Sequence, residues 1–149
     1  MGLLDAMNIS QEGMRAHSMR LDIHTKNIAN IDTPNYIRKI PILVAKEDIS
    51  FSGLLSNLKK NTAKTTSISL LGAGGVEMPG VVYDPTQGDM IYKPGHPDAD
   101  KNGYIRMSNV DPMVEMADAM MSSRAYEANL AVAGIAKAMA QRAAEIGKA

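Results

Sequence analysis

Among its 149 residues the sequence has no cysteine, no tryptophan and a single phenylalanine. Without cysteine these residues can form neither a disulfide nor a thiolate metal site. Large aromatic side chains dominate most compact cores, and five tyrosines are the only others of that kind here. The twelve methionines, by contrast, suit irregular gaps between helices. We therefore expect a thin core and an apolar surface that meets other helices.

The sequence also lacks an excess of charge and a long apolar run. Sixteen basic and sixteen acidic side chains give a formal net charge of zero, which argues against a nucleic acid partner because phosphate binding needs a basic surface. Nowhere do eighteen apolar residues follow one another, so we expect no membrane insertion. "MGLLDAMNIS" has neither the basic nor the apolar region of a secretory signal, and we expect no cleaved signal peptide.

Residues 3 to 31 are predicted to form one long helix. Steps of three and four residues trace a heptad seam in which one position per heptad is firmly apolar. The helix would be roughly 43 Å long, more than the width of a small globular domain. The second seam position is polar in three heptads, so this helix needs partners. The apolar positions, which we predict to form an assembly interface, are Met7, Met14, Leu21 and Ile28.

A second long helix is predicted from Pro112 to Ile146. Asp111 is a natural N-cap, and Pro112 suits the first helical position because a proline there loses no hydrogen bond. Steps of three and four then give ten positions, of which all except Arg142 are apolar. Two long seamed helices are expected to pair as an antiparallel or coiled hairpin. The seam residues predicted for the assembly interface are Val114, Met121, Ala128, Val132, Ile135 and Met139.

Between the helices, over residues 36 to 107, the period becomes β-like. Gly, Pro and Asp separate short β-prone runs. "FSGLLSNLKKN" suits a short helix, "TAKTT" a mobile loop, and "LLGAGGV" a flexible turn. The predicted fold is α+β: a coiled-coil-like stalk of two terminal helices (1–35 and 108–149) with a small β-rich insert (36–107). The predicted strands are 40–44, 66–71, 75–83, 90–92 and 104–107.

His17 and His24 lie on the seam of the first helix and raise the question of a metal. Seven residues separate them, which is roughly 10.5 Å along the axis and too far to share one ion. Packed or interface histidines, with a pH response where subunits meet, are favoured instead.

"DADKNG" matches the first half of an EF-hand loop, with Asp98, Asp100 and Asn102 as possible calcium ligands. Asn109 stands at the twelfth position, where a bidentate glutamate is needed. A polar hairpin turn with Gly103 at positive φ is favoured over calcium. We expect no metal and no cofactor.

No arrangement of side chains predicts catalysis. "LLGAGGV" is glycine-rich but lacks the lysine and hydroxyl residue of a phosphate-binding loop. No serine, histidine and aspartate constellation stands out, and no carboxylate pair has distinct acid and base surroundings. We therefore expect neither an enzyme nor a small-molecule substrate.

"SSRAYEANL" is the unusual stretch of the second helix. Arg124 and Glu127 are three residues apart, with the cation nearer the N-terminus, which is the weaker order for a pair within a helix. Tyr126 is large on a face otherwise rich in alanine. Two interpretations stay open: a solvated face with one snorkelling tyrosine, or side chains that reach another chain, since Tyr and Arg are favoured interface anchors.

Two stretches together resemble the flagellar axial proteins, and most of all the basal-body rod proteins. They are "NISQEGMRAHSMRLDIHTKNIANIDTPNY" near the start and "GHPDADKNGYIRMSNVDPMVEMADAMMSSRAYEANL" toward the end. Lys26 and Asn35 stand where the family usually has Asn and Gly. The residues that match the family motifs are Asn27, Ala29, Asn30, Thr33, Arg124, Tyr126, Glu127 and Asn129.

The resemblance implies a structural role in the rod, a shaft that crosses the periplasm and transmits torque. Terminal helices of many subunits would pack into a helical tube, with other copies of the chain and neighbouring rod proteins as partners. The flagellar export apparatus would carry the chain without a cleaved signal, and the termini would order on assembly. The alternatives are another rod or hook-type subunit, a soluble coiled-coil adaptor or a calcium-binding module.

A polar segment follows the first helix and is predicted to form a corner. Asn30 is suited to leave the helix in a left-handed conformation. Pro34 pushes Thr33 toward extended geometry, and Asn35 is expected to take the positive φ of the turn. The corner would send the chain from the helical stalk into the β-rich insert.

Overall fold

The computed structural model describes residues 2 to 46 and 74 to 146. Two long helices flank two small antiparallel hairpins, which confirms the predicted α+β fold. The strand predicted at 66–71, the helix predicted at 51–61 and the loop predicted at 62–66 lie outside the described residues. The elements are α1 (Leu3–Ala29), β1 (Lys39–Lys46), β2 (Gly75–Tyr83), β3 (Met90–Tyr92), β4 (Tyr104–Arg106) and α3 (Pro112–Ile146).

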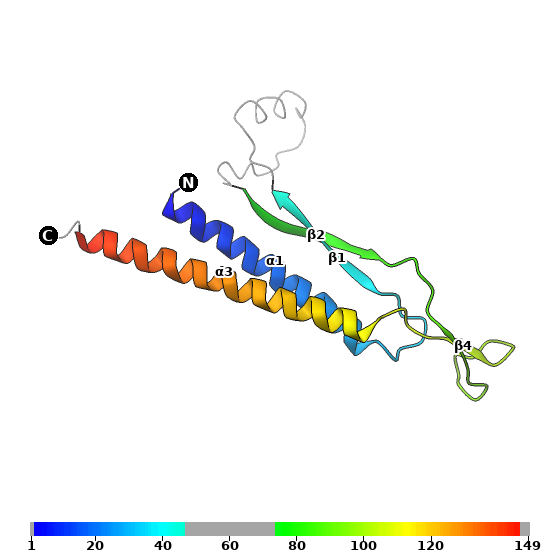
Figure 1. Ribbon diagram of the computed structural model, residues 1–149. Helices are drawn as coiled ribbons and strands as arrows, with labels where there is room; N and C mark the ends of the chain where they lie inside the picture. Colours follow the sequence, from blue (N-terminus) through cyan, green and yellow to red (C-terminus); the bar gives the residue numbers. More distant parts are fainter. Residues whose placement is uncertain (1, 47–73, 147–149) are drawn as a thin grey trace, which may run out of the picture.

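The two helices run antiparallel, and α1 lies between α3 and the ribbon formed by β1 and β2 (Figure 1). The β3–β4 hairpin projects from the end of the molecule where α1 finishes and α3 begins. The predicted helical hairpin is thus confirmed. None of the helices in the described ranges is long and apolar enough to cross a membrane.

Helix α1 ends as predicted at the polar segment, but in a different conformation. Asn30 has φ −108°, so the predicted left-handed exit is wrong. Its side-chain amide instead donates to the Lys26 carbonyl oxygen at 2.8 Å, which satisfies a helix-end acceptor without a left-handed residue. Asn35 has φ 58°, as predicted, and the Tyr36 N–H donates to the Thr33 carbonyl across the turn at 3.3 Å.

Helix α3 begins at the predicted cap. The Asp111 carboxylate accepts a hydrogen bond from the Met113 N–H at 2.9 Å, and the Asp111 carbonyl accepts one from the Glu115 N–H at 3.0 Å. The cap fixes the start of α3, and with it the helical position of Glu115.

The β1–β2 ribbon packs one face on α1. Its register pairs Ile40 with Val82 and Ile42 with Gly80, and then shifts before Val44. Gly75 is the first residue of β2, and most of the turn predicted over "LLGAGGV" lies outside the described residues. A Cβ at Gly75 would overlap the Glu12 carboxylate, because this side chain of α1 lies against the start of β2.

A polar turn joins β3 and β4, as predicted for "DADKNG". Gly103 has φ 81°, and the Asp100 carboxylate accepts hydrogen bonds from the Asn102 and Tyr104 N–H groups at 2.8 and 2.9 Å. The rings of Tyr92 and Tyr104 meet edge to face at 5.2 Å between centroids. This carboxylate therefore serves the turn.

The core is thin, as the composition predicts. Of the described apolar side chains, only those of Ala16, Ile105, Val110 and Ala136 are buried. Five of the described polar residues are buried as well, so the helix pair is held by polar contacts as much as by apolar ones. They are Ser10, His24, Asn27, Glu115 and Ser122.

Candidate functional site at the helix pair

The face of α3 that meets α1 consists of small and polar residues. Glu115, Ser122 and Ala136 are buried and Asn129 is half-buried, each seven residues from the next. Opposite Asn129 stands Gly13, where a Cβ would lie 2.7 Å from the Asn129 side-chain oxygen. The two helices approach closely because neither carries a large side chain at this crossing.

The two helices pair, but the apolar seam of α3 does not face α1. Val114, Met121 and Ile135 each precede a buried position by one residue, which turns them roughly 100° around the helix from the contact with α1. They are exposed by 44, 61 and 62%. The remaining seam residues, Ala128, Val132 and Met139, are also exposed.

The other flank of α3 is apolar too. Met113, Met116 and Met120 are exposed by 74, 49 and 58%. Apolar side chains are thus exposed on both flanks of the contact with α1, and exposed apolar patches mark interaction sites. In the single chain, α1 covers one narrow side of α3.

The seam of α1 is better covered, because α1 has the ribbon on one side and α3 on the other. Met7, Met14, Leu21 and Ile28 are half-buried. His17 lies between Met14 and Leu21 on this seam, and its Nδ1 is buried with no hydrogen-bond partner in the described residues. Burial, and secondarily the charge of Arg20, lowers the pKa of His17.

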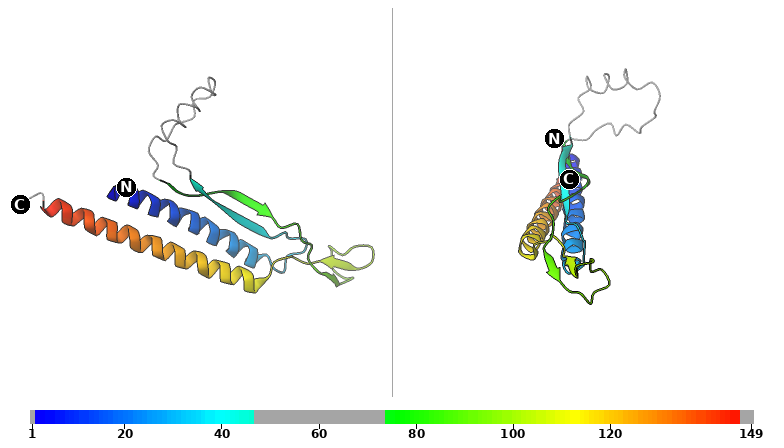
Figure 2. Two further views of the ribbon diagram at one scale, coloured as in Figure 1. Left: turned by 45° about the horizontal axis from the view of Figure 1, so that its top comes forward. Right: turned by 90° about the vertical axis from the view of Figure 1, so that its right-hand side faces the viewer.

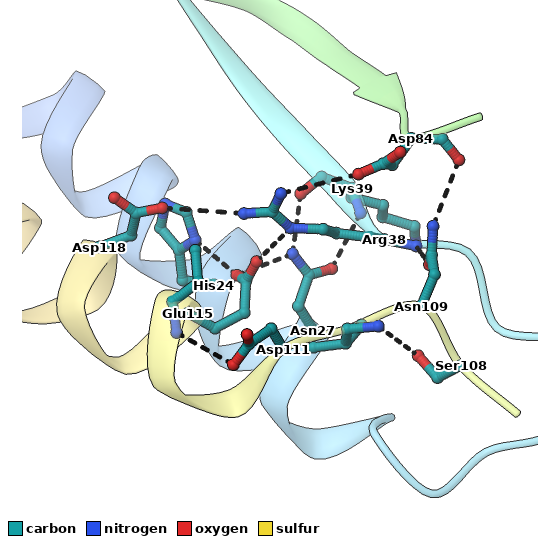
Figure 3. A network of polar contacts seen from close by, with 12 residues as sticks. His24, Asn27, Arg38, Lys39, Asp84, Ser108, Asn109, Asp111, Glu115 and Asp118 are labelled. Atoms are coloured by element: carbon teal, nitrogen blue, oxygen red, sulfur yellow. Dashed lines mark hydrogen bonds and ion pairs between the residues drawn. The ribbon is translucent and has the colours of Figure 1, made fainter. Parts of the chain in front are cut away.

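Glu115 is the centre of a buried polar cluster where α1, α3 and the start of β1 meet (Figure 3). Its carboxylate accepts hydrogen bonds from His24 Nδ1 at 2.7 Å, Asn27 Nδ2 at 3.0 Å and Arg38 Nε at 2.5 Å. Burial by itself would raise the pKa of Glu115. The three hydrogen bonds and the charge of Arg38 outweigh burial, so the pKa is lowered. We call these four residues the Glu115 cluster.

Further charges surround the cluster. Arg38 also faces Asp84 at 3.7 Å and Asp118 at 3.8 Å, and Asp118 lies 3.5 Å from Arg20. The Arg20 Nε–H points at His24 Nε2 at 3.4 Å, which leaves the hydrogen of the imidazole on the Nδ1 that faces Glu115. The hydrogen bond of Glu115 raises the pKa of Arg38, so its charge is fixed.

Asn27 joins the cluster to the ribbon. Its amide nitrogen donates to the Lys39 carbonyl at 2.8 Å, and its oxygen accepts from the Lys39 N–H and the Tyr36 hydroxyl, both at 3.1 Å. The side chain thus pairs with the first residue of β1 as a neighbouring strand would. All hydrogen-bonding atoms of this fully buried amide have partners.

Asn109 fixes the segment after the cluster. Its oxygen accepts from the Arg38 N–H at 2.7 Å, and its nitrogen donates to the Thr86 carbonyl at 2.9 Å. Asp84, which faces Arg38, also accepts from the Thr86 hydroxyl and N–H, and these bonds lower the pKa of Asp84. The exit of the corner, the end of β2 and the approach to α3 are therefore held together.

The other motif residues are spread along the helices. Ala29 is the exposed last residue of α1, and Thr33 donates to the Asn30 side chain at 3.2 Å. Asn129 donates to the Ala125 carbonyl at 2.8 Å beside Gly13. In the described part of α3, Arg124 and Glu127 are exposed without an ion pair between them, and Tyr126 is 38% exposed.

Among the described residues, no three His, Cys, Asp or Glu side chains are arranged to hold a metal ion. His17 and His24 point into different surroundings. His24 bonds to Glu115, whereas His17 lies farther along the seam.

Sequence reasoning missed Glu115 and Arg38. The available signal was a second heptad position of α3, at which Glu115, Ser122, Asn129 and Ala136 repeat at a spacing of seven beside the apolar seam. Small polar residues that repeat at helical spacing can indicate a close contact between helices, just as an apolar stripe can. Arg38 carries no such periodic signal.

Comparison with known proteins identifies the family. Residues 7–36 match the model described as "Flagella basal body rod protein", and residues 101–146 match "Flagellar basal body rod FlgEFG protein C-terminal". A Buchnera aphidicola protein named flagellar basal-body rod protein FlgC is 34% identical, with 99% of this chain and all of the relative covered. The chain belongs to the FlgC family. The FlgC proteins of Bacillus subtilis and Salmonella typhimurium are 32 and 30% identical, with 96 and 99% of this chain and 97 and 100% of the relatives covered.

FlgC-family membership makes the chain a structural component of the flagellar basal-body rod, and neither matching model describes an enzyme. The two matched segments correspond to α1 with its corner, and to β4 with α3. The Glu115 cluster joins them, since His24 and Asn27 come from the first segment and Glu115 from the second.

Proposed function

We propose that the chain acts as a non-catalytic rod subunit that assembles through its terminal helices with other copies of itself and with neighbouring rod proteins. One observation carries the proposal: α3 packs against α1 through its small and polar residues and leaves its apolar seam exposed. Val114, Met121, Val132, Ile135 and Met139 would be covered by neighbouring subunits. Burial of one such side chain contributes about 1.5 to 3 kcal/mol, so a few of them supply a stable contact.

The Glu115 cluster would give the assembled subunit its stiffness. A buried polar network in which each group has its partners is rigid and specific in geometry. This network lies where the helix pair meets the ribbon, the point at which a twisting load on the helices reaches the β-rich part. A rod that transmits torque across the periplasm needs such a junction.

A thin core also suits transport by the export apparatus. The chain has no disulfide to reduce, and few apolar side chains are buried among the described residues. Opening the helix pair therefore exposes little new apolar surface. The folded subunit would be completed in the rod, where neighbours cover α3.

The exposed motif side chains of α3 belong to the same proposal. Arg124 and Tyr126 are both exposed on α3, outside the row of residues that contacts α1. In the assembled rod they would contact another chain, as Arg and Tyr anchors commonly do. The separate interpretation of a solvated face predicts that Arg124→Ala leaves motility unchanged.

Substitution of Met121 separates folding from assembly. Because Met121 is 61% exposed, Met121→Asp should change the free energy of unfolding of the purified chain by no more than about 0.5 kcal/mol. In the rod the same aspartate would be buried without a partner, at a cost of about 3 kcal/mol or more. Cells that carry the variant should therefore lack motility and complete basal bodies.

The matched control is Met121→Leu, which keeps the apolar volume and should leave cells motile. Normal swimming of the Met121→Asp strain would show that the seam faces solvent in the rod, and the proposed interface would be wrong.

A further inference from the structure

The β1–β2 ribbon has an apolar face that the described residues leave uncovered. Alternation along the strands directs Pro41 and Leu43 toward α1, whereas the side chains between them point away. A sheet with one solvated face normally carries polar residues on that face, and a sheet apolar on both faces is covered on both. The uncovered residues, here called the outer ribbon face, are Ile40, Ile42, Val44 and Val82, exposed by 36, 38, 44 and 48%.

The chain cannot cover this face with its own α3. The strands β1 and β2 contact α1 and do not contact α3 in the described ranges. The left-hand view of Figure 2 shows α1 between α3 and the ribbon. The part of the subunit that the structure describes therefore presents two apolar surfaces, the seam of α3 and the outer ribbon face, with α1 between them.

We propose that the outer ribbon face binds the C-terminal part of the α3 seam, Val132 to Arg142, of a second copy of this chain. The proposal rests on the proposed function, because it names the partner of a seam that is an interface only if the chain assembles. Since the two surfaces differ, the contact is heterologous. Repeated from copy to copy, it forms a ring or a helix rather than a closed pair.

The lengths of the two surfaces agree. Ile40 to Val44 spans four residues of strand, roughly 14 Å. Val132 to Arg142 spans ten residues of helix, roughly 15 Å. One line of apolar side chains on α3 can therefore contact the whole outer ribbon face.

The charges at the ends of the two surfaces are complementary. Glu77 is exposed beside Val44, its partner across the ribbon. On α3 the exposed Arg142, three residues after Met139, interrupts the apolar seam before Ile146. With Arg142 placed beside Glu77, Ile40 comes to lie near Val132, so charge and apolar pairing agree in one orientation.

Gly80 provides room in the middle of the outer ribbon face. It pairs with Ile42, and a Cβ at this position would meet nothing within 4 Å. Open space therefore adjoins the backbone of Gly80 beside Ile42. A long and flexible seam side chain such as Met139 can lie over this position without a clash.

Cross-linking tests the contact directly, because the natural chain contains no cysteine. The double variant Ile42→Cys with Met139→Cys, assembled in cells and treated with a short bismaleimide, should give a ladder of dimers, trimers and larger products. Chains with Ile42→Cys mixed with chains with Met139→Cys should stop at the dimer. The control, Asp98→Cys with Met139→Cys, places the first cysteine on the β3–β4 turn and should give no ladder.

Three results would overturn the proposal: no product between positions 42 and 139, a product between two copies of position 139 alone, or linkage of position 42 to a rod protein of different mass. A loss of motility by Met121→Asp combined with any of these would leave the proposed function intact and reject only the ribbon contact. A motile Met121→Asp strain without products from either cysteine would reject the proposed function itself.

Charge exchange provides an independent test. Glu77→Arg and Arg142→Glu should each reduce motility, because each places like charges together at one end of the contact. The double variant should restore motility toward that of the natural chain. A double variant no better than the worse single variant would contradict the orientation and overturn the proposal.

Discussion

The side-chain amide of Asn27 donates a hydrogen bond to the Glu115 carboxylate across 3.0 Å, although 88 positions separate the two residues in the sequence. The same amide pairs with both backbone groups of Lys39. One short side chain thus links α1, β1 and α3. Aspartate has the same shape as asparagine but no N–H donors, and glutamine is longer by one methylene. Asn27 can link the three elements because its side chain has both the N–H donors and the length that these contacts need.

Asn27→Asp should therefore destabilise the chain. The new carboxylate would face the Glu115 carboxylate and the Lys39 carbonyl, where the amide now donates to both. A buried charge left without its donor partners costs about 3 to 5 kcal/mol. We expect a loss of that order in the free energy of urea unfolding, measured by circular dichroism at pH 7.

Asn8→Asp supplies the matched control, because it makes the same chemical change at an exposed position of the same helix. It should alter the free energy of unfolding by about 0.5 kcal/mol or less. Equal losses for the two variants would show that the pairing of Asn27 with Glu115 does not hold the helices together.

Acid should weaken the fold through Glu115. Its pKa is lowered in the folded chain from an ordinary value of 4.5, because its hydrogen bonds and the charge of Arg38 outweigh burial. A lowered pKa stabilises the fold above the ordinary value, and this stability is lost as the pH falls through the folded-state pKa. The urea midpoint should therefore fall as the pH is lowered from about 5 toward 3.

Glu115→Gln isolates this contribution, since Asp84 also has a lowered pKa and titrates in the same direction. The variant should be less stable at pH 7, where the natural carboxylate bonds to Arg38. Its stability should change less than that of the natural chain below pH 4.5, the ordinary pKa of the carboxylate. Glu127→Gln, at an exposed position, should keep the natural pH profile. Parallel profiles for the natural chain and Glu115→Gln would contradict the assignment.

Local chemistry allowed much of the fold to be predicted. The strand at 75–83 and the short strand at 90–92 have the predicted bounds, because glycine, proline and aspartate delimit them. Asp111 caps α3, and Asn35 takes the positive φ of its turn, because few residue types satisfy either position at low cost. These features depend on neighbours in the sequence.

Features that depend on distant partners could not be predicted in this way. Periodicity identified an apolar seam on α3 that includes Met121, but it could not tell whether that seam meets α1 or another chain. Ser122, one residue later, faces α1 instead. Asn30 likewise ends the helix through the bond of its side chain to Lys26, which propensity alone does not distinguish from a left-handed exit. The partners of Glu115 lie 77 to 91 positions away.

Two helical glycines should respond oppositely to alanine. At Gly134 a Cβ would meet nothing within 4 Å, so Gly134→Ala should raise the free energy of unfolding by about 0.5 to 1 kcal/mol through helix propensity. At Gly13 the new methyl group would displace the Asn129 side chain from its bond to the Ala125 carbonyl. Gly13→Ala should therefore leave the melting temperature of the chain unchanged or lower it. Equal gains would mean that Gly13 and Asn129 do not touch in solution.

Amide hydrogen exchange should show where the free subunit is ordered. The Glu115 cluster joins α1 and α3 at one end only, whereas the seam of α3 toward its C-terminus is exposed in the single chain. Helical segments with few buried apolar contacts open readily. In the purified monomer, amides near His24 and Glu115 should exchange most slowly, and those near Leu3 and Ile146 should exchange fast. Assembly into rods should slow exchange most along Val132 to Ile146, where neighbours would cover the helix. Uniform protection to both helix ends in the monomer would contradict the view that assembly completes the folding of the termini.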